Sequence, residues 1–193
     1  MCTCCSALRD STRAVRHPPG AHACWVAHSA DWCLACNPEW GCDQSTLFSH
    51  SRNLSDCRGV TDVSALRTVS VLNLNCCDGV TDVSALGDVA CLDLSHLRIS
   101  DVSALGGVHT LNLGCCENVV GVSALGEVHS LNPFRCRRLT DVSALHSVDT
   151  LNLSFYESLV DVSAPGGVRS LNLGHCDGVA DVSALGGVFM AWA

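Results

Sequence analysis

The sequence predicts a solenoid, an elongated fold made of stacked copies of one short structural unit. The phrase Asp-Val-Ser-Ala-Leu begins at Asp62, Asp82, Asp101, Asp141 and Asp181, with Pro165 in place of the Leu in the copy at Asp161, and Gly121 replaces the Asp in one further copy. Successive copies are 20 residues apart, except for a single step of 19 residues after the second copy. Self-similarity at a fixed period of this length is the sequence signature of a repeat architecture.

Each unit contains the signals of one strand and one helical turn. Leu111-Asn112-Leu113 alternates apolar and polar residues, which is typical of a short strand with both leucines on one face. The Asp-Val-Ser-Ala-Leu phrase predicts a tight helical turn, because Asp can cap free backbone N–H groups and a Gly after the Leu can end the turn. Such a short unit cannot bury its own apolar side chains, so neighbouring units must bury them for one another.

The expected strands recur once per unit, and two prolines interrupt the pattern. The repeats begin near Arg52, and strands are expected at 71–74, 91–94, 110–113, 130–132, 150–153 and 170–173. Pro133 replaces the second Leu of one strand, so it should remove a backbone donor from the sheet. Pro165 replaces the Leu of one helical turn. The chain stops inside its last expected strand. The unpaired edge there is expected to pair with a partner or a second copy, to fray, or to mark a truncated piece of a longer array, and we favour truncation or self-association.

The repeated residues resemble the leucine-rich repeat family. Leu111, Leu113, Cys116 and Val119 fit the family frame Leu-x-Leu-x-x-Asn/Cys-x-x-Leu, and residues 80–86 are similar to a phrase of internalin-type repeats. The cysteine in the Asn position is similar to the cysteine-containing repeats of F-box-type proteins. The resemblance covers about residues 51–193. It implies an α/β repeat fold, a leucine-rich repeat solenoid with a parallel sheet on the concave side and short helical turns on a thin convex side.

The chain divides at about residue 50. Residues 51–193 are expected to form the solenoid of about seven units, and residues 1–50 are a leader rich in Cys, His and Trp. We expect the leader to be partly disordered over residues 1–23, or to cap the first repeat. Cys24, His28, Cys33 and Cys36 have the ligand types of a tetrahedral zinc site. A metal-binding module, with the repeats as a stalk, is therefore the alternative function.

We call a set of residues that occupy the same position in successive repeats a column, and two columns contain residue types that could carry chemistry. The first holds Cys57, Cys77, Cys116, Cys136 and Cys176, with Leu97 and Tyr156 in the equivalent places. Because apolar residues substitute for Cys, this column is expected to be a buried ladder rather than a set of disulfides or metal ligands. The second is the column of Asp residues, where stacked carboxylates suggest acid–base chemistry or calcium. We favour capping, because each Asp precedes a turn and one copy functions with Gly.

Composition excludes several classes of function. The formal net charge of −8 argues against a nucleic-acid or anionic-membrane surface, and no apolar stretch is long enough to cross a membrane. No catalytic or phosphate-binding motif is present, so we expect neither an enzyme nor a cofactor. The N-terminus has no apolar signal core, which favours an intracellular, cytoplasmic protein.

The expected function is therefore a scaffold or adaptor that binds other proteins. The Asn residues between the strand leucines should line the outer face of the sheet, where they can bond to one another. A more distinctive feature is a cluster of aromatic and basic residues in an otherwise acidic chain. The candidate protein-binding residues are Phe134, Arg135, Arg137, Arg138, Phe155 and Tyr156.

Overall fold

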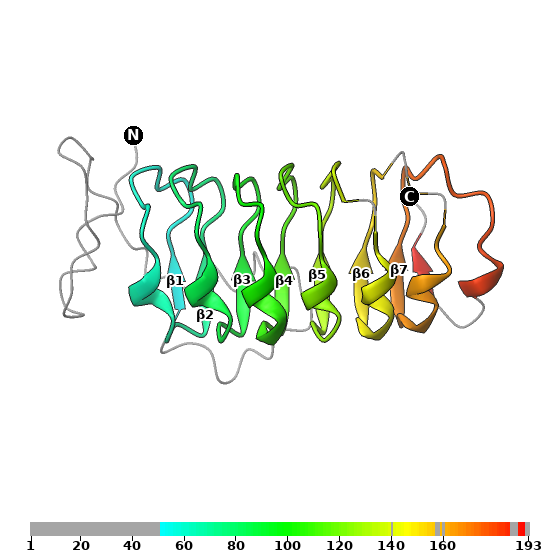
Figure 1. Ribbon diagram of the computed structural model, residues 1–193, viewed down its shortest axis with the longest axis horizontal. Coiled ribbons are helices and arrows are strands. Elements are labelled where there is room, and N and C mark those ends of the chain that lie inside the picture. Colours follow the sequence, from blue (N-terminus) through cyan, green and yellow to red (C-terminus); the bar gives the residue numbers. More distant parts are fainter. Residues whose placement is uncertain (1–50, 140, 157–158, 160, 186–188, 192–193) are drawn as a thin grey trace.

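The protein folds into one parallel β-sheet whose strands follow each other in sequence order (Figure 1). The computed structural model describes residues 51–193, apart from positions 140, 157–158, 160, 186–188 and 192–193. The strands are β1 (Ser51–Asn53), β2 (Val71–Asn73), β3 (Cys91–Asp93), β4 (Thr110–Asn112), β5 (Ser130–Asn132), β6 (Thr150–Asn152), β7 (Ser170–Asn172) and β8 (Phe189–Ala191). The expected strand segments are confirmed, and the sheet is parallel because each strand pairs with its own copy one repeat later.

A row of short 3₁₀ helices forms the second layer, in front of the sheet in Figure 1. They are η4 (Ser64–Leu66), η5 (Ser84–Leu86), η6 (Ser103–Gly107), η7 (Ser123–Leu125), η8 (Ser143–Ser147), η9 (Ala164–Gly167) and η10 (Ser183–Leu185). The helical turn expected from Asp-Val-Ser-Ala-Leu is therefore present in each unit. It is a 3₁₀ turn because the backbone N–H of Leu86 donates to the carbonyl of Val83, three residues earlier, at 3.0 Å.

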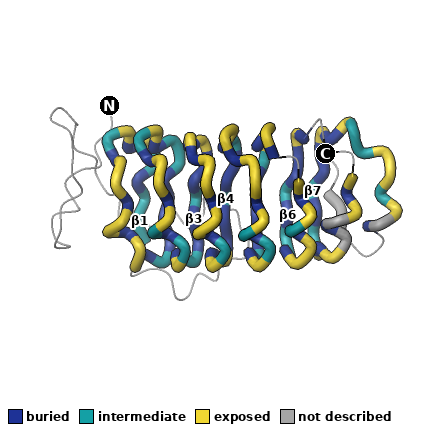
Figure 2. The backbone as a smooth tube through the Cα atoms, in the orientation of Figure 1, coloured by how far each residue is buried: buried dark blue, intermediate teal, exposed yellow. Residues whose placement is uncertain are grey.

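The core is built on an inward-pointing residue at every third position outside the strands. Along one coil these residues are Leu74, Cys77, Val80, Val83, Leu86, Val89 and Leu92, and none is more than 3% exposed. The carbonyl of each inward residue commonly accepts the backbone N–H of the next, as in Cys77 to Leu74 at 3.0 Å and Val80 to Cys77 at 2.9 Å. Outside the strands, two exposed or half-buried residues commonly separate the inward ones, so buried and exposed positions alternate along each coil (Figure 2).

Glycine after the turn serves a different purpose from the one expected. Gly87 has a φ of −62°, a right-handed conformation that any residue adopts, so it does not end η5 through a left-handed cap. A Cβ at Gly87 would instead lie 2.3 Å from the carbonyl oxygen of Ala104 in the next repeat. The same contact recurs at Gly126, where a Cβ would lie 2.6 Å from the carbonyl oxygen of Ala144. Glycine is favoured here because successive turns pack backbone against backbone.

Pro133 shortens one strand pairing of the sheet, whereas the 19-residue unit leaves the pairing intact. The backbone N–H of Leu113 donates to the backbone carbonyl of Asn132 at 2.8 Å, and that of Leu153 donates to the carbonyl of Asn172 at 2.9 Å. Pro133, at the equivalent position between them, has no N–H to donate to the next strand. The pairing of β5 with β6 accordingly covers two residue pairs, where β4 and β5 form three. The 19-residue unit keeps its register, because the missing residue falls in the loop after β3.

The cysteine column is a buried ladder, as expected, and its thiols also donate hydrogen bonds. Cys116 and Cys136 are completely buried, and their Sγ atoms lie 3.1 Å from the carbonyl oxygens of Leu94 and Leu113 in the preceding repeat. Tyr156 occupies the same column, is 3% exposed, and donates its hydroxyl to the carbonyl of Pro133. Burial raises the pKa of Cys116 to about 12 and that of Cys136 to about 11.

The proposals made for the leader lie outside the described residues. These are its disorder or capping role and the zinc ligands Cys24, His28, Cys33 and Cys36. In the part of the chain that the structure describes, no three His, Cys, Asp or Glu side chains are arranged to hold a metal ion. None of the described helices has the length and hydrophobicity needed to cross a membrane.

Candidate protein-binding surface

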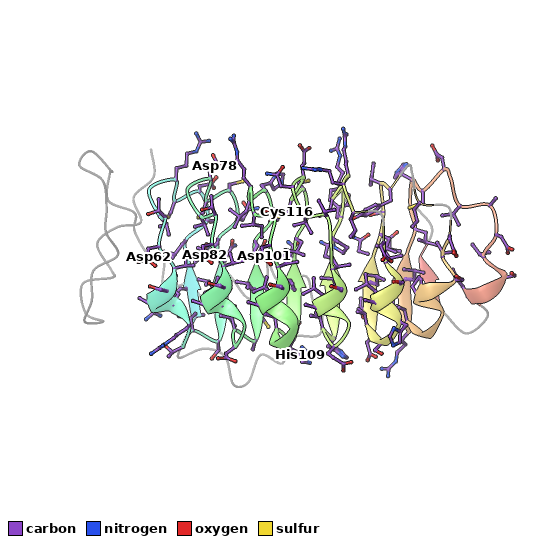
Figure 3. All side chains as sticks on the ribbon, in the orientation of Figure 1. Asp62, Asp78, Asp82, Asp101, His109 and Cys116 are labelled. Carbon is purple, nitrogen blue, oxygen red and sulfur yellow. The ribbon has the colours of Figure 1, made fainter. Side chains whose placement is uncertain are left out.

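The solenoid carries its polar side chains in rows that run along its length. Figure 3 shows Asp62, Asp82 and Asp101 in one row at the helical turns, with Asp78 on one edge of the solenoid and His109 on the opposite edge. Each row arises because the same position of the repeat faces the same direction in every coil. The rows on the helical turns, on the outer sheet face and on the two edges can therefore be assessed separately as candidate sites.

The row of Asp residues is accounted for by turn formation. Asp62 and Asp101 each accept the backbone N–H of the Ser two residues later, at 2.9 Å. The residue at the N-cap position is the intervening Val, so Asp acts one position earlier than expected, by closing a turn of its own. Hydrogen bonds from the backbone and side chain of this Ser lower the pKa of Asp62. The hydrogen bonds and the lowered pKa both indicate that these carboxylates hold the backbone of the turn in place.

The row of Asn residues on the outer sheet face is also mainly structural. Asn112 and Asn132 each use Oδ1 to accept the backbone N–H two residues later, at 3.0 and 3.2 Å. Asn132 also donates from Nδ2 to Oδ1 of Asn112 at 3.0 Å, as expected for a ladder. Asn73 likewise accepts the backbone N–H of Asn75 through Oδ1, at 2.7 Å. The asparagines thus end the strands and start the loops that follow.

The edge with His109 carries a short polar network. The rings of His109 and His129 stack with centroids 4.6 Å apart, and Nδ1 of His129 lies 3.3 Å from Oδ2 of Asp149. The same carboxylate oxygen lies 3.5 Å from Arg169, whose side chain is 81% exposed. Burial lowers the pKa of His109, and so does the adjacent His129, whereas Asp149 opposes them. His129 and Arg169 both contact the carboxylate of Asp149, so these described side chains interact with one another rather than converge on a ligand site.

The opposite edge is formed by the loops that directly follow the strands. One residue in each of these loops has a positive φ, between 57° and 64°. The residues are Asp56, Cys76, His96, Cys115, Arg135, Phe155 and His175. We call this set the left-handed column. Its members differ from repeat to repeat in charge, size and chemistry, and none of them is buried.

The aromatic members of this edge form a continuous contact. Phe134 and Phe155 meet edge to face with ring centroids 5.2 Å apart, and Phe155 and His175 lie 4.2 Å apart. The guanidinium of Arg135 lies 6.0 Å from the centroid of Phe155, at the limit of a cation–π contact. Phe155 is 39% exposed, which is unusual for a large apolar side chain in this protein.

Five of the six predicted binding residues lie at this surface, and one does not. Phe134 is half-buried, whereas Arg135, Arg137, Arg138 and Phe155 are exposed. Tyr156 was wrongly included, because its side chain points into the cysteine column and its hydroxyl is used inside the core. The aromatic–arginine patch is therefore defined here as Phe134, Arg135, Arg137, Arg138, Phe155 and His175.

A groove continues from the patch along the same edge. It has a volume of about 720 Å³, and its charged lining residues include Arg58, Asp78, Arg98, Glu117 and Arg135. Positive and negative residues alternate from one repeat to the next, and Nε of Arg58 lies 3.8 Å from Oδ2 of Asp78. Such a row tends to neutralise itself, whereas the patch groups three arginines within one loop.

Sequence reasoning missed two parts of this edge, namely His175 and the groove. The signal for His175 was its spacing, since it lies one repeat after Phe155 and two after Arg135. The alternating charges were also present in the sequence, one per repeat. Neither feature belongs to a known short motif, so only alignment of the repeats by position would have found them.

Comparison with known proteins identifies the fold. No family model matches the sequence, and no curated protein is significantly similar to it. Among solved structures, an internalin (inlF) from Listeria monocytogenes matches with a TM-score of 0.59 and 21% identity, over 74% of this chain and 46% of that one. An internalin C2 (inlC2) from the same bacterium has a TM-score of 0.42 and 16% identity, over 78% of this chain and 66% of that one.

A third match is a functional domain of InlJ from Listeria monocytogenes, which is described as including a cysteine ladder. Its TM-score is 0.42 at 19% identity, over 68% of this chain and 37% of that one. The chain thus spans less than half the length of the inlF internalin. Together with the parallel sheet and the short helical turns, the inlF match shows that the protein is a leucine-rich repeat solenoid.

Proposed function

We propose that this protein is a non-enzymatic scaffold or adaptor that binds another protein through the aromatic–arginine patch. The fold supports this function, because a solenoid presents long rows of side chains on a rigid frame. The internalin-like fold is compatible with the same role. The patch also has the residue types that dominate protein interfaces, since aromatic residues and Arg are enriched there.

The left-handed column is the observation that carries the proposal. A positive φ costs a residue with a side chain about 1–2 kcal/mol, and glycine adopts it without that penalty. None of the seven members of the column is glycine, and the patch places Arg135, Phe155 and His175 there. Backbone strain of this kind is typical of functional sites. The cost is consistent with side chains that are retained for contact with a partner.

A second observation concerns the regularity of the repeat next to the patch. Two residues that depart from their columns lie next to the patch: Pro133 directly precedes Phe134, and Tyr156 directly follows Phe155. The backbone contact between Arg135 N and Ser154 O is also long, at 3.4 Å, where the equivalent contact between Cys115 and Phe134 is 2.7 Å. The solenoid therefore departs from its own pattern where the patch is found.

Replacing Phe155 by glycine tests the proposal without relying on a damaged fold. Phe155→Gly removes the central ring and relieves the positive φ, so the thermal midpoint should stay unchanged or rise slightly. Cys76→Gly is the matched control, because Cys76 has the same backbone conformation four repeats away. With a photoreactive amino acid at position 137, cross-links to partner proteins should disappear in Phe155→Gly and persist in Cys76→Gly. Equal cross-linking in both variants would rule out the patch as the binding surface.

A further inference from the structure

We propose that the partner of the aromatic–arginine patch is an acidic protein segment that carries one apolar or aromatic side chain. This inference rests on the proposed function and adds the chemistry of the bound segment. It follows from the charge of the patch, from its exposed rings and from its dimensions.

The charge of the patch is opposite to that of the protein. The chain has a formal net charge of −8, yet Arg135, Arg137 and Arg138 are exposed together in the loop after β5. Among the described residues, the recorded ion pairs join Arg58 to Asp78, and His129 and Arg169 to Asp149, so none involves this group. Guanidinium groups outside these ion pairs remain available to carboxylates, with which they form paired hydrogen bonds.

The rings beside the arginines provide the apolar half of the site. Phe155 lies between Phe134 and His175, in contact with both rings, and it remains 39% exposed. Edge-to-face and tilted stacking hold the rings in place, which limits the entropy lost when a ligand binds. An aliphatic or aromatic side chain placed against Phe155 would remove this exposed surface from water.

The dimensions of the patch limit the bound segment to a few residues. The patch extends over the loops after β5, β6 and β7, and neighbouring strands are about 4.8 Å apart, so it spans roughly 10 Å. An extended chain covers about 3.3 Å per residue, so about three residues span the patch. The recognised unit is therefore one apolar residue with acidic residues next to it, directed toward Arg135, Arg137 and Arg138.

A single-stranded nucleic acid is the other ligand class that uses arginines and aromatic rings. It is disfavoured because its phosphates continue beyond any short site. On either side of the patch a strand would approach Glu117 and Asp177, both of which are exposed. The acidic surface would repel such a polyanion, whereas a short acidic peptide ends before it reaches these residues.

Binding of defined peptides to the full chain tests the inference. The probes are fluorescent peptides of equal length: Glu and Asp around a central Trp, Glu and Asp around a central Gly, and Lys around a central Trp. A single-stranded oligonucleotide of thymidines is the fourth probe. We expect the acidic Trp peptide to bind best, and to bind about tenfold more weakly when Trp becomes Gly. Its affinity should also fall as salt is raised, because exposed charges are screened.

Two double variants with equal changes in charge locate the binding. Arg137→Glu with Arg138→Glu should weaken the acidic Trp peptide about tenfold or more. Arg67→Glu with Arg169→Glu is the control, because both side chains are exposed and lie outside the patch. The control should leave the affinity within about twofold, since long-range surface charges are screened.

The outcomes separate this inference from the proposed function. Equal binding of the acidic and basic Trp peptides, or preference for the basic peptide or the oligonucleotide, would overturn the acidic partner. If no peptide binds while cross-linking through position 137 still depends on Phe155, the acidic partner is also overturned. The scaffold function would then stand. If cross-linking is also independent of Phe155, the scaffold function fails together with the inference.

Discussion

At the scale of single residues, the structure distinguishes positions that organise the backbone from positions that face solvent. Asp in the recurring phrase closes a turn by accepting the N–H of the following Ser, and Gly121 is the one copy without this carboxylate. An ideal Cβ at Gly121 would have no atom within 4 Å, so a side chain can be added there. The missing turn can therefore be restored by a single substitution.

We predict that Gly121→Asp raises the thermal midpoint by a few degrees, because its carboxylate would accept the N–H of Ser123. Gly121→Ala is the control, since it reduces the freedom of the unfolded chain in a similar way but provides no acceptor. Thermal unfolding followed by circular dichroism compares the three proteins. The interpretation of the Asp row fails if the Ala and Asp variants are equally stable.

The adjacent pair Cys115 and Cys116 should show opposite reactivity in the native protein. Cys115 is partly exposed on the edge, whereas Cys116 is completely buried and its pKa is raised to about 12 by burial. Because the thiolate is the reactive form, we expect alkylation of Cys116 to be about a hundredfold or more slower. Peptide mass mapping after timed iodoacetamide treatment measures both sites in one digest. Equal rates before unfolding would contradict the buried thiol ladder.

At the scale of elements, β5 and β6 form the shortest pairing among the described strands. Pro133 removes one backbone donor and one Leu side chain, and Tyr156 of the next repeat takes the place of a much smaller Cys. The hydroxyl of Tyr156 reaches the same carbonyl position that cysteine thiols reach in other repeats. The two departures therefore compensate one another in volume and in hydrogen bonding.

We predict strong coupling between Pro133→Leu and Tyr156→Cys in a double-mutant cycle. Pro133→Leu alone should overpack the junction, and Tyr156→Cys alone should leave a cavity, each costing about 1–3 kcal/mol in the free energy of unfolding. The double variant restores both repeat residues and should recover about 1–3 kcal/mol relative to the sum. Urea unfolding at equilibrium gives all four values. Additive effects would show that the two residues do not share one packing site.

At the scale of the whole molecule, repetition multiplies small effects. Six Asp residues of one row have a pKa below their ordinary value, because each accepts hydrogen bonds from a Ser backbone and side chain. A lowered pKa in the folded state means that ionisation stabilises the fold above the unfolded pKa. This stabilisation is lost as the pH falls through the lower folded value.

We therefore predict that the thermal midpoint falls as the pH is lowered below the ordinary carboxyl pKa of 3.8. The triple variant Asp62→Asn, Asp82→Asn and Asp101→Asn should lose part of this dependence, because an Asn oxygen accepts the same bond without titrating. Its control replaces three exposed carboxylates in other columns: Asp88→Asn, Glu127→Gln and Asp177→Asn. Identical pH profiles for the two triple variants would refute a role for the Asp row in acid stability.

The sequence by itself determined the architecture, because the repeat specifies neighbouring contacts one unit at a time. The period fixed the pairing of each strand with its copy, and Leu111 and Leu113 marked the buried face of the sheet. The buried cysteine column followed from Leu97 and Tyr156 in equivalent places. The loss of one backbone hydrogen bond at Pro133 was also predictable, since a residue without an N–H cannot donate to the next strand in any parallel sheet.

Only the tertiary structure decided which exposed side chains meet. The contact of Phe155 with His175 and the close approach at Gly87 depend on how successive coils stack. The positive φ of most edge residues was hidden as well, because Cys, Arg and Phe are not signals for that conformation. Local pattern determines a repeat and its core, whereas a binding surface arises from differences between repeats, which become neighbours only after the coils have stacked.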